Sequence, residues 1–232
     1  MTIRAVVFDL DGTITRFNLD YRAVRAEVIS LLTRAGMPAS ALSMNESTFG
    51  MLRKTETFMK INGKTEVEAA KVIGEALALI EEREMEAAKN TELMSGVLET
   101  LKALKGRGLK IGLCTINGKK STEHILNRFG IEKRFDAVIT RDKVRSVKPN
   151  TEHLQTVLDV LDVSANEAVI VGDGPSDMRC GKELKVIAVG LPTGESSQET
   201  LAECGANYVI TALTDLPELI EHINKATRMR MK

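Results

Sequence analysis

The chain has 232 residues, of which 43% are hydrophobic, and it balances 32 basic against 32 acidic side chains. This length allows one large domain or two smaller ones, and the balanced charge argues against a general nucleic-acid-binding protein. No apolar run approaches the ~20 residues of a membrane-spanning helix, so no membrane partner is expected. Three widely spaced cysteines (Cys114, Cys180 and Cys204) and the lack of a signal-peptide pattern predict reduced thiols and a cytoplasmic location.

The first predicted element is a strand over residues 5–8 (AVVF), whose β-branched and aromatic residues are typical of a strand buried on both faces. Two carboxylates, Asp9 and Asp11, follow it, and Gly12 allows the backbone to turn sharply. Like charges this close repel each other unless a cation or a shared proton offsets the repulsion. Asp-Gly pairs are also common in solvated turns, so this stretch by itself leaves a functional and a structural interpretation open.

Residues 18 to about 90 carry no strand signal and instead show helical periodicity. Helices are predicted within residues 20–36 and 48–63, each ended by a glycine, and a third helix opens at a Thr65–Glu68 capping box. The apolar face expected for this third helix consists of Val67, Ala70, Ile73, Leu77 and Ile80. Short stretches broken by glycine favour a compact helical unit over a coiled-coil arm.

Beyond residue 90, short apolar strands alternate with amphipathic helices, which indicates βαβ units and a mainly parallel sheet. The predicted strands cover residues 109–114, 137–140, 168–172, 186–190 and 208–210. The predicted helices cover residues near 96–106, 119–129, 151–161, 176–184, 196–204 and 215–225. The N-terminal strand belongs to the same sheet, because a lone strand cannot satisfy its own backbone. The expected fold class is α/β, a doubly wound and mainly parallel sheet with a small all-helical domain inserted after its first strand.

Polar residues follow further strands of this sheet. Thr115 comes directly after one strand, with Asn117 close behind at the start of a helix. A hydroxyl, an amide and free helix N–H groups can hold phosphate oxygens, although the same residues also make an ordinary helix cap. Lys148 precedes a proline, which favours an extended backbone, while Asp173 and Asp177 lie four residues apart after an apolar strand. Doubly wound sheets build their sites at the carboxyl ends of strands, where all of these residues are expected.

In this order along the chain, DLDGT, the Thr115 strand end, the Lys148-Pro dipeptide and GDGPSD resemble the four motifs of the haloacid dehalogenase superfamily. The resemblance covers essentially the whole chain. Within the superfamily, the chain is similar to phosphoglycolate phosphatase-like members, which carry a helical cap between the first two motifs. It implies a Rossmann-like catalytic core over residues 1–17 and 91–232 and a helical cap over residues 18–90. One departure is that the amide of Asn117 comes one position later than in many members.

The resemblance implies a phosphatase with defined roles for these residues. Asp9 would be the nucleophile that forms an aspartyl-phosphate. Asp11 would protonate the leaving oxygen and then activate the water that hydrolyses the intermediate. Thr115 would donate to a phosphoryl oxygen, with Asn117 as a further substrate-binding residue. Lys148 would bind the transferring group and stabilise its charge.

The resemblance also implies a magnesium site. Mg²⁺ would bind the side chains of Asp9 and Asp173 and the main-chain carbonyl of Asp11. Asp177 would support these ligands through water or a hydrogen bond. A cation there would neutralise the gathered carboxylates.

A small phosphorylated metabolite is the expected partner, because capped members of this kind act on phosphoglycolate, sugar phosphates and similar esters. Asp11 argues against the halide-releasing branch, which lacks this aspartate. A phosphomutase of the β-phosphoglucomutase type stays open, since it uses the same core. A receiver-like signalling module or a phosphate-binding protein without turnover is less well supported, because a receiver has neither the helical insert nor an acceptor after its first strand. Neither the exact ester nor the oligomeric state is indicated by a motif.

Overall fold

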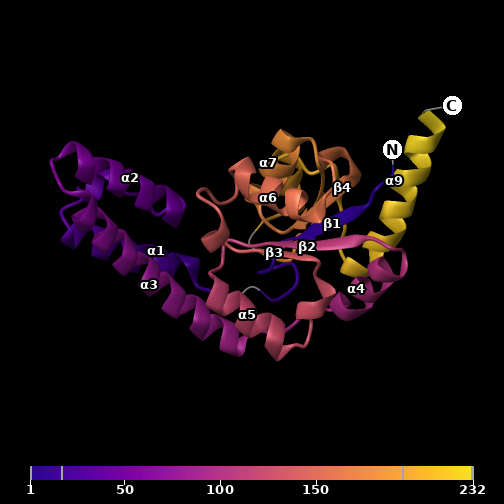
Figure 1. Cartoon of the computed structure of the whole chain (residues 1–232), viewed down its shortest axis with the longest axis horizontal. Helices are drawn as coiled ribbons and strands as arrows, with labels where there is room; N and C mark the ends of the chain where they lie inside the picture. Colours follow the sequence, from indigo (N-terminus) through magenta and orange to yellow (C-terminus); the bar gives the residue numbers. More distant parts are fainter. Residues whose placement is uncertain (1, 17, 195, 231–232) are drawn as a thin grey trace. The chain divides into compact units, whose positions relative to one another are not determined.

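The computed structural model describes residues 2–16, 18–194 and 196–230 (Figure 1). The chain forms two compact units, one from Met1–Asn18 with Asn90–Lys232 and the other from Leu19–Lys89. Within the described ranges, every helix is too short or too polar to cross a bilayer.

A six-stranded sheet forms the centre of the larger unit. In chain order its strands are β1 (Ala5–Phe8), β2 (Lys110–Cys114), β3 (Ala137–Ile139), β4 (Ala168–Gly172), β5 (Ile187–Gly190) and β6 (Tyr208–Val209). They pair in parallel in the order β3-β2-β1-β4-β5-β6, so the strand order reverses between β1 and β4. Open parallel sheets bind ligands outside the strand ends at such a reversal. The expected doubly wound α/β fold class is confirmed.

The register of the central strands determines which residues meet at this edge. Phe8 at the end of β1 lies level with Leu113 of β2 and Val171 of β4. The residues that come next along these three strands therefore emerge side by side. Asp9 follows Phe8 immediately, and its N–H donates to the carbonyl of Val171 at 2.9 Å.

Helices cover both faces of the sheet (Figure 1). The helices of this unit are α4 (Val97–Gly106), α5 (Lys119–Arg128), α6 (Thr151–Leu161), α7 (Pro175–Leu184), α8 (Gln198–Glu203) and α9 (Leu216–Arg230). Figure 1 shows α4 and α5 across the sheet from α6 and α7, and α9 packs against α4. Helix α9 extends five residues beyond the expected end at 225.

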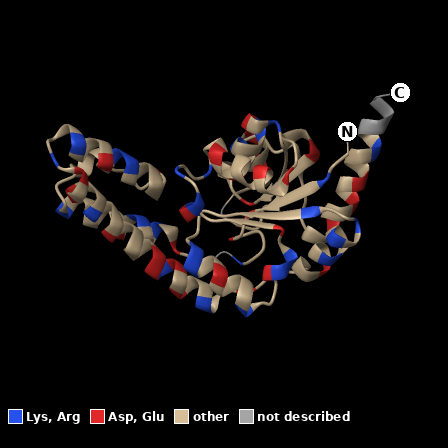
Figure 2. Ribbon diagram, in the orientation of Figure 1, with Lys and Arg blue, Asp and Glu red and all other residues tan. Residues whose placement is uncertain are grey.

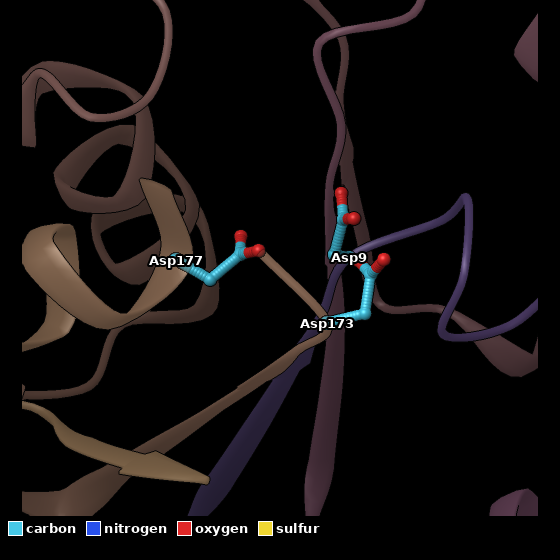
Figure 3. A group of neighbouring side chains, drawn as sticks. All are labelled: Asp9, Asp173 and Asp177. Atoms are coloured by element: carbon cyan, nitrogen blue, oxygen red, sulfur yellow. The ribbon is translucent and has the colours of Figure 1, made fainter. Parts of the chain in front are cut away.

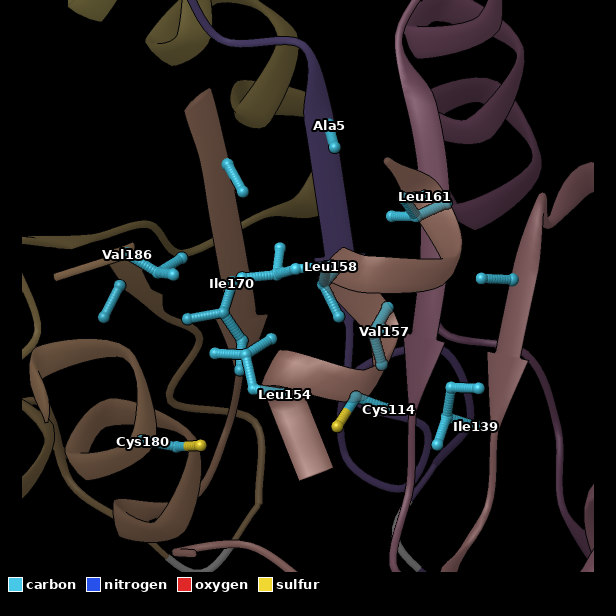
Figure 4. Close-up of a cluster of buried hydrophobic side chains, with 14 of the residues drawn as sticks. Ala5, Cys114, Ile139, Leu154, Val157, Leu158, Leu161, Ile170, Cys180 and Val186 are labelled. Atoms are coloured by element: carbon cyan, nitrogen blue, oxygen red, sulfur yellow. The ribbon is translucent and has the colours of Figure 1, made fainter. Parts of the chain in front are cut away.

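A buried apolar cluster fixes α6 and α7 on the sheet (Figure 4). Leu154, Val157, Leu158 and Leu161 recur at helical spacing along α6 and are at most 2% exposed. They pack with Ile170 and other inward-facing strand residues. Burying each large aliphatic side chain stabilises the fold by roughly 1.5–3 kcal/mol. This face therefore forms a rigid support for the loops that lead into α6 and α7.

The strands themselves are almost free of charge. Figure 2 shows the charged residues mostly on helices and connections, and Lys110 is the only charged residue within the six strands. Strands covered by helices on both faces exclude charge in this way, because burying an unpaired ion is costly. Charged groups near the sheet are thus confined to its ends.

The smaller unit is entirely helical in its regular structure. It contains α1 (Tyr21–Arg34), α2 (Thr48–Ile61) and most of α3 (Glu66–Asn90). Side chains of Asp20 and Ser47 cap the first two helices. At α3, Thr65 and Glu68 form the expected reciprocal capping box, with bonds of 2.9 and 3.2 Å.

The smaller unit has a hydrophobic core of its own, and three of the five residues expected on the apolar face of α3 pack there: Ile80 is buried in it, and Ile73 and Leu77 are partly buried against it. The buried apolar positions of α3 are Ala69, Ala76, Ile80 and Ala88, whereas Val67 is 79% exposed and Ala70 also faces solvent. Ala76 is buried in the same core, and its small side chain allows the helices to approach closely.

Candidate active site

The turn after β1 brings Asp9 and Asp11 to the carboxyl edge of the sheet. Gly12 has a φ of 76°, a left-handed backbone conformation that is unfavourable for residues with a Cβ atom. A Cβ on Gly12 would also overlap the carboxylate of Asp173. Glycine is therefore required at position 12 for two reasons, the left-handed backbone conformation and the close approach of the Asp173 carboxylate.

Three carboxylates from separate elements meet at this edge (Figure 3). Asp9 follows β1, Asp173 follows β4 and Asp177 lies in the first turn of α7, and one oxygen of each lies within 4.8 Å of the others. Asp173 is 7% exposed and Asp177 is 2% exposed. Gly172 makes this approach feasible, because a Cβ at that position would overlap the Asp177 carboxyl group.

Lys148 lies among these acids. Its Nζ donates to Asp9 Oδ1 at 2.7 Å and to Asp177 Oδ1 at 2.6 Å, and its side chain is 2% exposed. Burial by itself would lower the pKa of this ammonium, but Asp177 and Asp9 outweigh that effect and raise it well above its ordinary value. The two hydrogen-bonded carboxylates thus favour the charged form of Lys148.

One ammonium does not neutralise three carboxylates. Burial, followed by repulsion from Asp9 and Asp177, raises the pKa of Asp173 above its ordinary value. Burial raises the pKa of Asp177 in the same way, although Lys148 opposes the shift. If all the groups are ionised, the acids exceed Lys148 by two negative charges. An oxygen-rich cluster with this charge fits a hard divalent cation such as Mg²⁺.

The loop after β2 comes to the same edge. Thr115 is 1% exposed, and its Oγ1 accepts a hydrogen bond from the N–H of Asn117 at 3.1 Å. The side-chain amide of Asn117 donates to Asp11 Oδ2 at 2.8 Å. The structure thus places Asn117 against the second aspartate of the opening motif, a contact that sequence reasoning did not anticipate.

Two further residues, which sequence reasoning missed, hold this loop. Arg141 follows β3, and its guanidinium donates to the carbonyl of Ile116 at 3.2 Å while its N–H donates to the carbonyl of Asn117 at 3.3 Å. Asp142 accepts from the N–H of Lys119 at 2.6 Å and so caps the start of α5. The sequence feature that could have indicated Arg141 and Asp142 is their position directly after a predicted strand, where other site residues also lie.

His153 is a third missed residue. It is fully buried on α6, where its Nδ1 accepts from the N–H of Lys148 at 3.3 Å and its Nε2 lies 3.2 Å from the carbonyl of Ile139. Only the neutral ring protonated on Nε2 can make both bonds. Burial and the nearby Lys148 charge lower the pKa of His153 to about 4. The ring therefore helps to anchor the backbone of Lys148.

We expect His153 to make the protein acid-sensitive. Above pH 6.5 the ring is neutral in both the folded and the unfolded chain. Between pH 6.5 and about 4 the unfolded ring takes up a proton that the folded ring does not. Relative to a His153→Gln variant, the wild type should therefore lose up to about 3 kcal/mol of unfolding free energy across this window. Urea denaturation at several pH values measures this, and parallel curves for the two proteins would contradict it.

A model of one protein family spans the whole site. Residues 6–191, which include every site residue from Asp9 to Asp177, match the model of haloacid dehalogenase-like hydrolases. The chain belongs to this family. The predicted family, and with it the predicted class of a phosphatase-type hydrolase, is confirmed.

Relatives of known name agree with this placement. Pyrophosphatase PpaX of Bacillus mycoides is 28% identical over 229 residues, which cover 97% of this chain and 100% of the relative. Phosphoglycolate phosphatase 1 of Pseudomonas aeruginosa is 28% identical over 218 residues, covering 92% and 78%. The crystal structure of a predicted phosphoglycolate phosphatase from Haemophilus somnus aligns with a TM-score of 0.62 at 20% identity and covers 94% and 98%. This last likeness shows the shared fold.

Proposed function

We propose that this haloacid dehalogenase-like hydrolase is a Mg²⁺-dependent phosphatase that works through an aspartyl-phosphate on Asp9. The observation that carries the proposal is the contact of Asp9 with the buried Lys148, beside two further carboxylates. Lys148 Nζ donates to Asp9 Oδ1 at 2.7 Å and so holds the nucleophilic carboxylate in place at the edge of the sheet.

Asp9 and Asp11 divide the chemistry between them. An Asp9 oxygen attacks phosphorus, and the bond from phosphorus to the leaving oxygen breaks with its electron pair on that oxygen. Asp11 supplies the proton that the leaving oxygen needs. In the second step Asp11 takes a proton from water, whose oxygen attacks phosphorus and releases the Asp9 carboxylate. Two neighbouring carboxylates in different surroundings suit these opposite tasks.

Mg²⁺ would be held by Asp9, Asp173 and the main-chain carbonyl of Asp11, with Asp177 in support. When bound, it would neutralise negative charge on the phosphoryl group and on the gathered acids. Asp177 accepts hydrogen bonds at both oxygens, from Lys148 Nζ at 2.6 Å and from the N–H of Gly174 at 3.3 Å, which agrees with a supporting role. Lys148 and the hydroxyl of Thr115 would stabilise the transferring group.

A small phosphate compound is the proposed substrate. Relatives named pyrophosphatase and phosphoglycolate phosphatase make pyrophosphate and phosphoglycolate the first compounds to test, followed by sugar phosphates. We assign the helical segment 18–90 as the cap that selects among them, and its separate core supports this assignment. Release of inorganic phosphate, rather than an isomeric phosphate ester, distinguishes a phosphatase from the phosphomutase alternative.

Magnesium dependence is the direct test of the proposed function. Hydrolysis of the panel should require Mg²⁺ and stop in excess chelator, and Asp173→Asn should lower kcat/KM by roughly 100-fold or more, since metal charge stabilisation is worth several kcal/mol. Mg²⁺ should also raise the melting temperature of the wild type but not of Asp173→Asn. The exposed Asp159→Asn serves as the control and should behave as wild type. Full activity without a divalent metal would contradict the proposal.

A further inference from the structure

We propose that Asn117 is a positioning residue that holds the Asp11 carboxylate for proton transfer. This inference rests on the proposed function, in which Asp11 is the general acid and base. Asn117 lies 106 residues from Asp11 in sequence, yet its Nδ2 is 2.8 Å from Asp11 Oδ2. A carboxylate only accepts hydrogen bonds, so the contact requires the NH₂ end of the amide.

The Asp11 carboxylate is held at both oxygens. Thr15 Oγ1 lies 3.1 Å from Asp11 Oδ1, opposite the bond from Asn117 to Oδ2. Thr15 belongs to the same turn as Asp11, whereas Asn117 belongs to the loop after β2. Because the two donors come from different elements, they restrict rotation of the side chain about both of its torsions. Hydrogen bonds to an ionised acceptor are about twice as strong as those between neutral groups.

Asn117 is itself fixed before it reaches Asp11. It is 4% exposed, its N–H donates to Thr115 Oγ1, and its carbonyl accepts from the N–H of Arg141. The guanidinium of Arg141 holds the preceding carbonyl of Ile116. The amide is therefore presented by a preorganised loop, so its bond to Asp11 costs little further conformational entropy.

This geometry gives Asn117 a different task from the phosphate contact expected from the sequence. A phosphate ligand would support binding of every substrate equally. A residue that positions Asp11 supports only the steps in which Asp11 moves a proton. Those steps are protonation of a poor leaving group and activation of water, since a good leaving group departs without acid help.

The test compares Asn117→Ala with wild type on an alkyl phosphate and on p-nitrophenyl phosphate. For the alkyl ester, kcat should fall about 10- to 100-fold, the cost of a misplaced catalytic group, with KM nearly unchanged. Formation of the phosphoenzyme from p-nitrophenyl phosphate should change less than about threefold, because this leaving group needs little acid. Hydrolysis of the intermediate should slow, so phosphate should accumulate on Asp9 in rapid-quench mass spectrometry.

Two matched variants complete the design. Asn127→Ala removes the same amide from an exposed position on α5 and should leave all rates unchanged. In an Asp11→Asn background, Asn117→Ala should have no further effect on phosphoenzyme formation, because the carboxylate through which Asn117 acts is absent. An equal slowing of phosphoenzyme formation from both substrates, or a raised KM for both, would overturn the inference in favour of a structural or phosphate-binding role. Lack of any phosphoenzyme in the wild type would instead refute the proposed function.

Discussion

Asp9→Asn is expected to abolish turnover and covalent phosphorylation together, with kcat falling by roughly 10⁴-fold or more, as for the loss of other enzymatic nucleophiles. A carboxamide is neutral and a poor nucleophile, although it occupies the same space. Its effect on the fold should be small, because the substitution removes one of three crowded carboxylates while Lys148 keeps its bond to Asp177.

Asp11→Asn should behave differently. It leaves Asp9 able to attack, and it keeps the main-chain carbonyl proposed to bind the metal, but it removes the group that activates water. With p-nitrophenyl phosphate as substrate, phosphorylation should proceed while hydrolysis stalls. Mass spectrometry should then find phosphate on Asp9 in the Asp11 variant and none in the Asp9 variant. Equal labelling of the two variants, or phosphate on another residue, would overturn the roles of the two aspartates.

Lys148→Met should have the largest effect on stability. The substitution keeps the length of the side chain but leaves Asp9, Asp173 and Asp177 without their buried counter-charge. Breaking a buried ion pair on one side costs about 3–5 kcal/mol. Without divalent metal, urea denaturation should show a loss of this size, and saturating Mg²⁺ should restore part of it by neutralising the same acids. Activity should fall together with stability, because Lys148 is proposed to stabilise the transferring group.

Lys105→Met is the matched control for this effect. Lys105 Nζ lies 2.6 Å from Asp136 Oδ2, a distance equal to that of the Lys148–Asp177 pair. The side chains of Lys105 and Asp136, however, are each about one-third exposed or more. Exposed pairs are worth about 0–1 kcal/mol because water and salt screen them. A loss of stability no greater than that of Lys105→Met would show that Lys148 is not the counter-charge of the acid cluster.

Much of this architecture follows from local sequence pattern. The runs AVVF and AVIVG are short, β-branched and nearly free of charge, so they predict central strands of a parallel sheet. Parallel strands end at a common edge, and for that reason Asp9, Thr115 and Asp173 could be placed together without a structure. The capping box at Thr65 is similarly local, because its two partners lie three residues apart.

Other features depend on which elements become neighbours. The bonds from Lys148 to Asp9 and from Asn117 to Asp11 join residues 139 and 106 positions apart. The bond from Asn117 exists because β2 lies beside β1, and the bond from Lys148 exists because α6, which begins just after it, packs on the sheet. No local pattern specifies either arrangement. The neutral His153 and the exposed Val67 also depend on tertiary packing, which determines the partners of a ring and the buried face of a helix. Local sequence pattern is enough to bring Asp9, Thr115 and Asp173 to one edge of the sheet. Which of their atoms meet depends on tertiary contacts, because hydrogen bonds require distances of about 3 Å between segments that are distant in the chain.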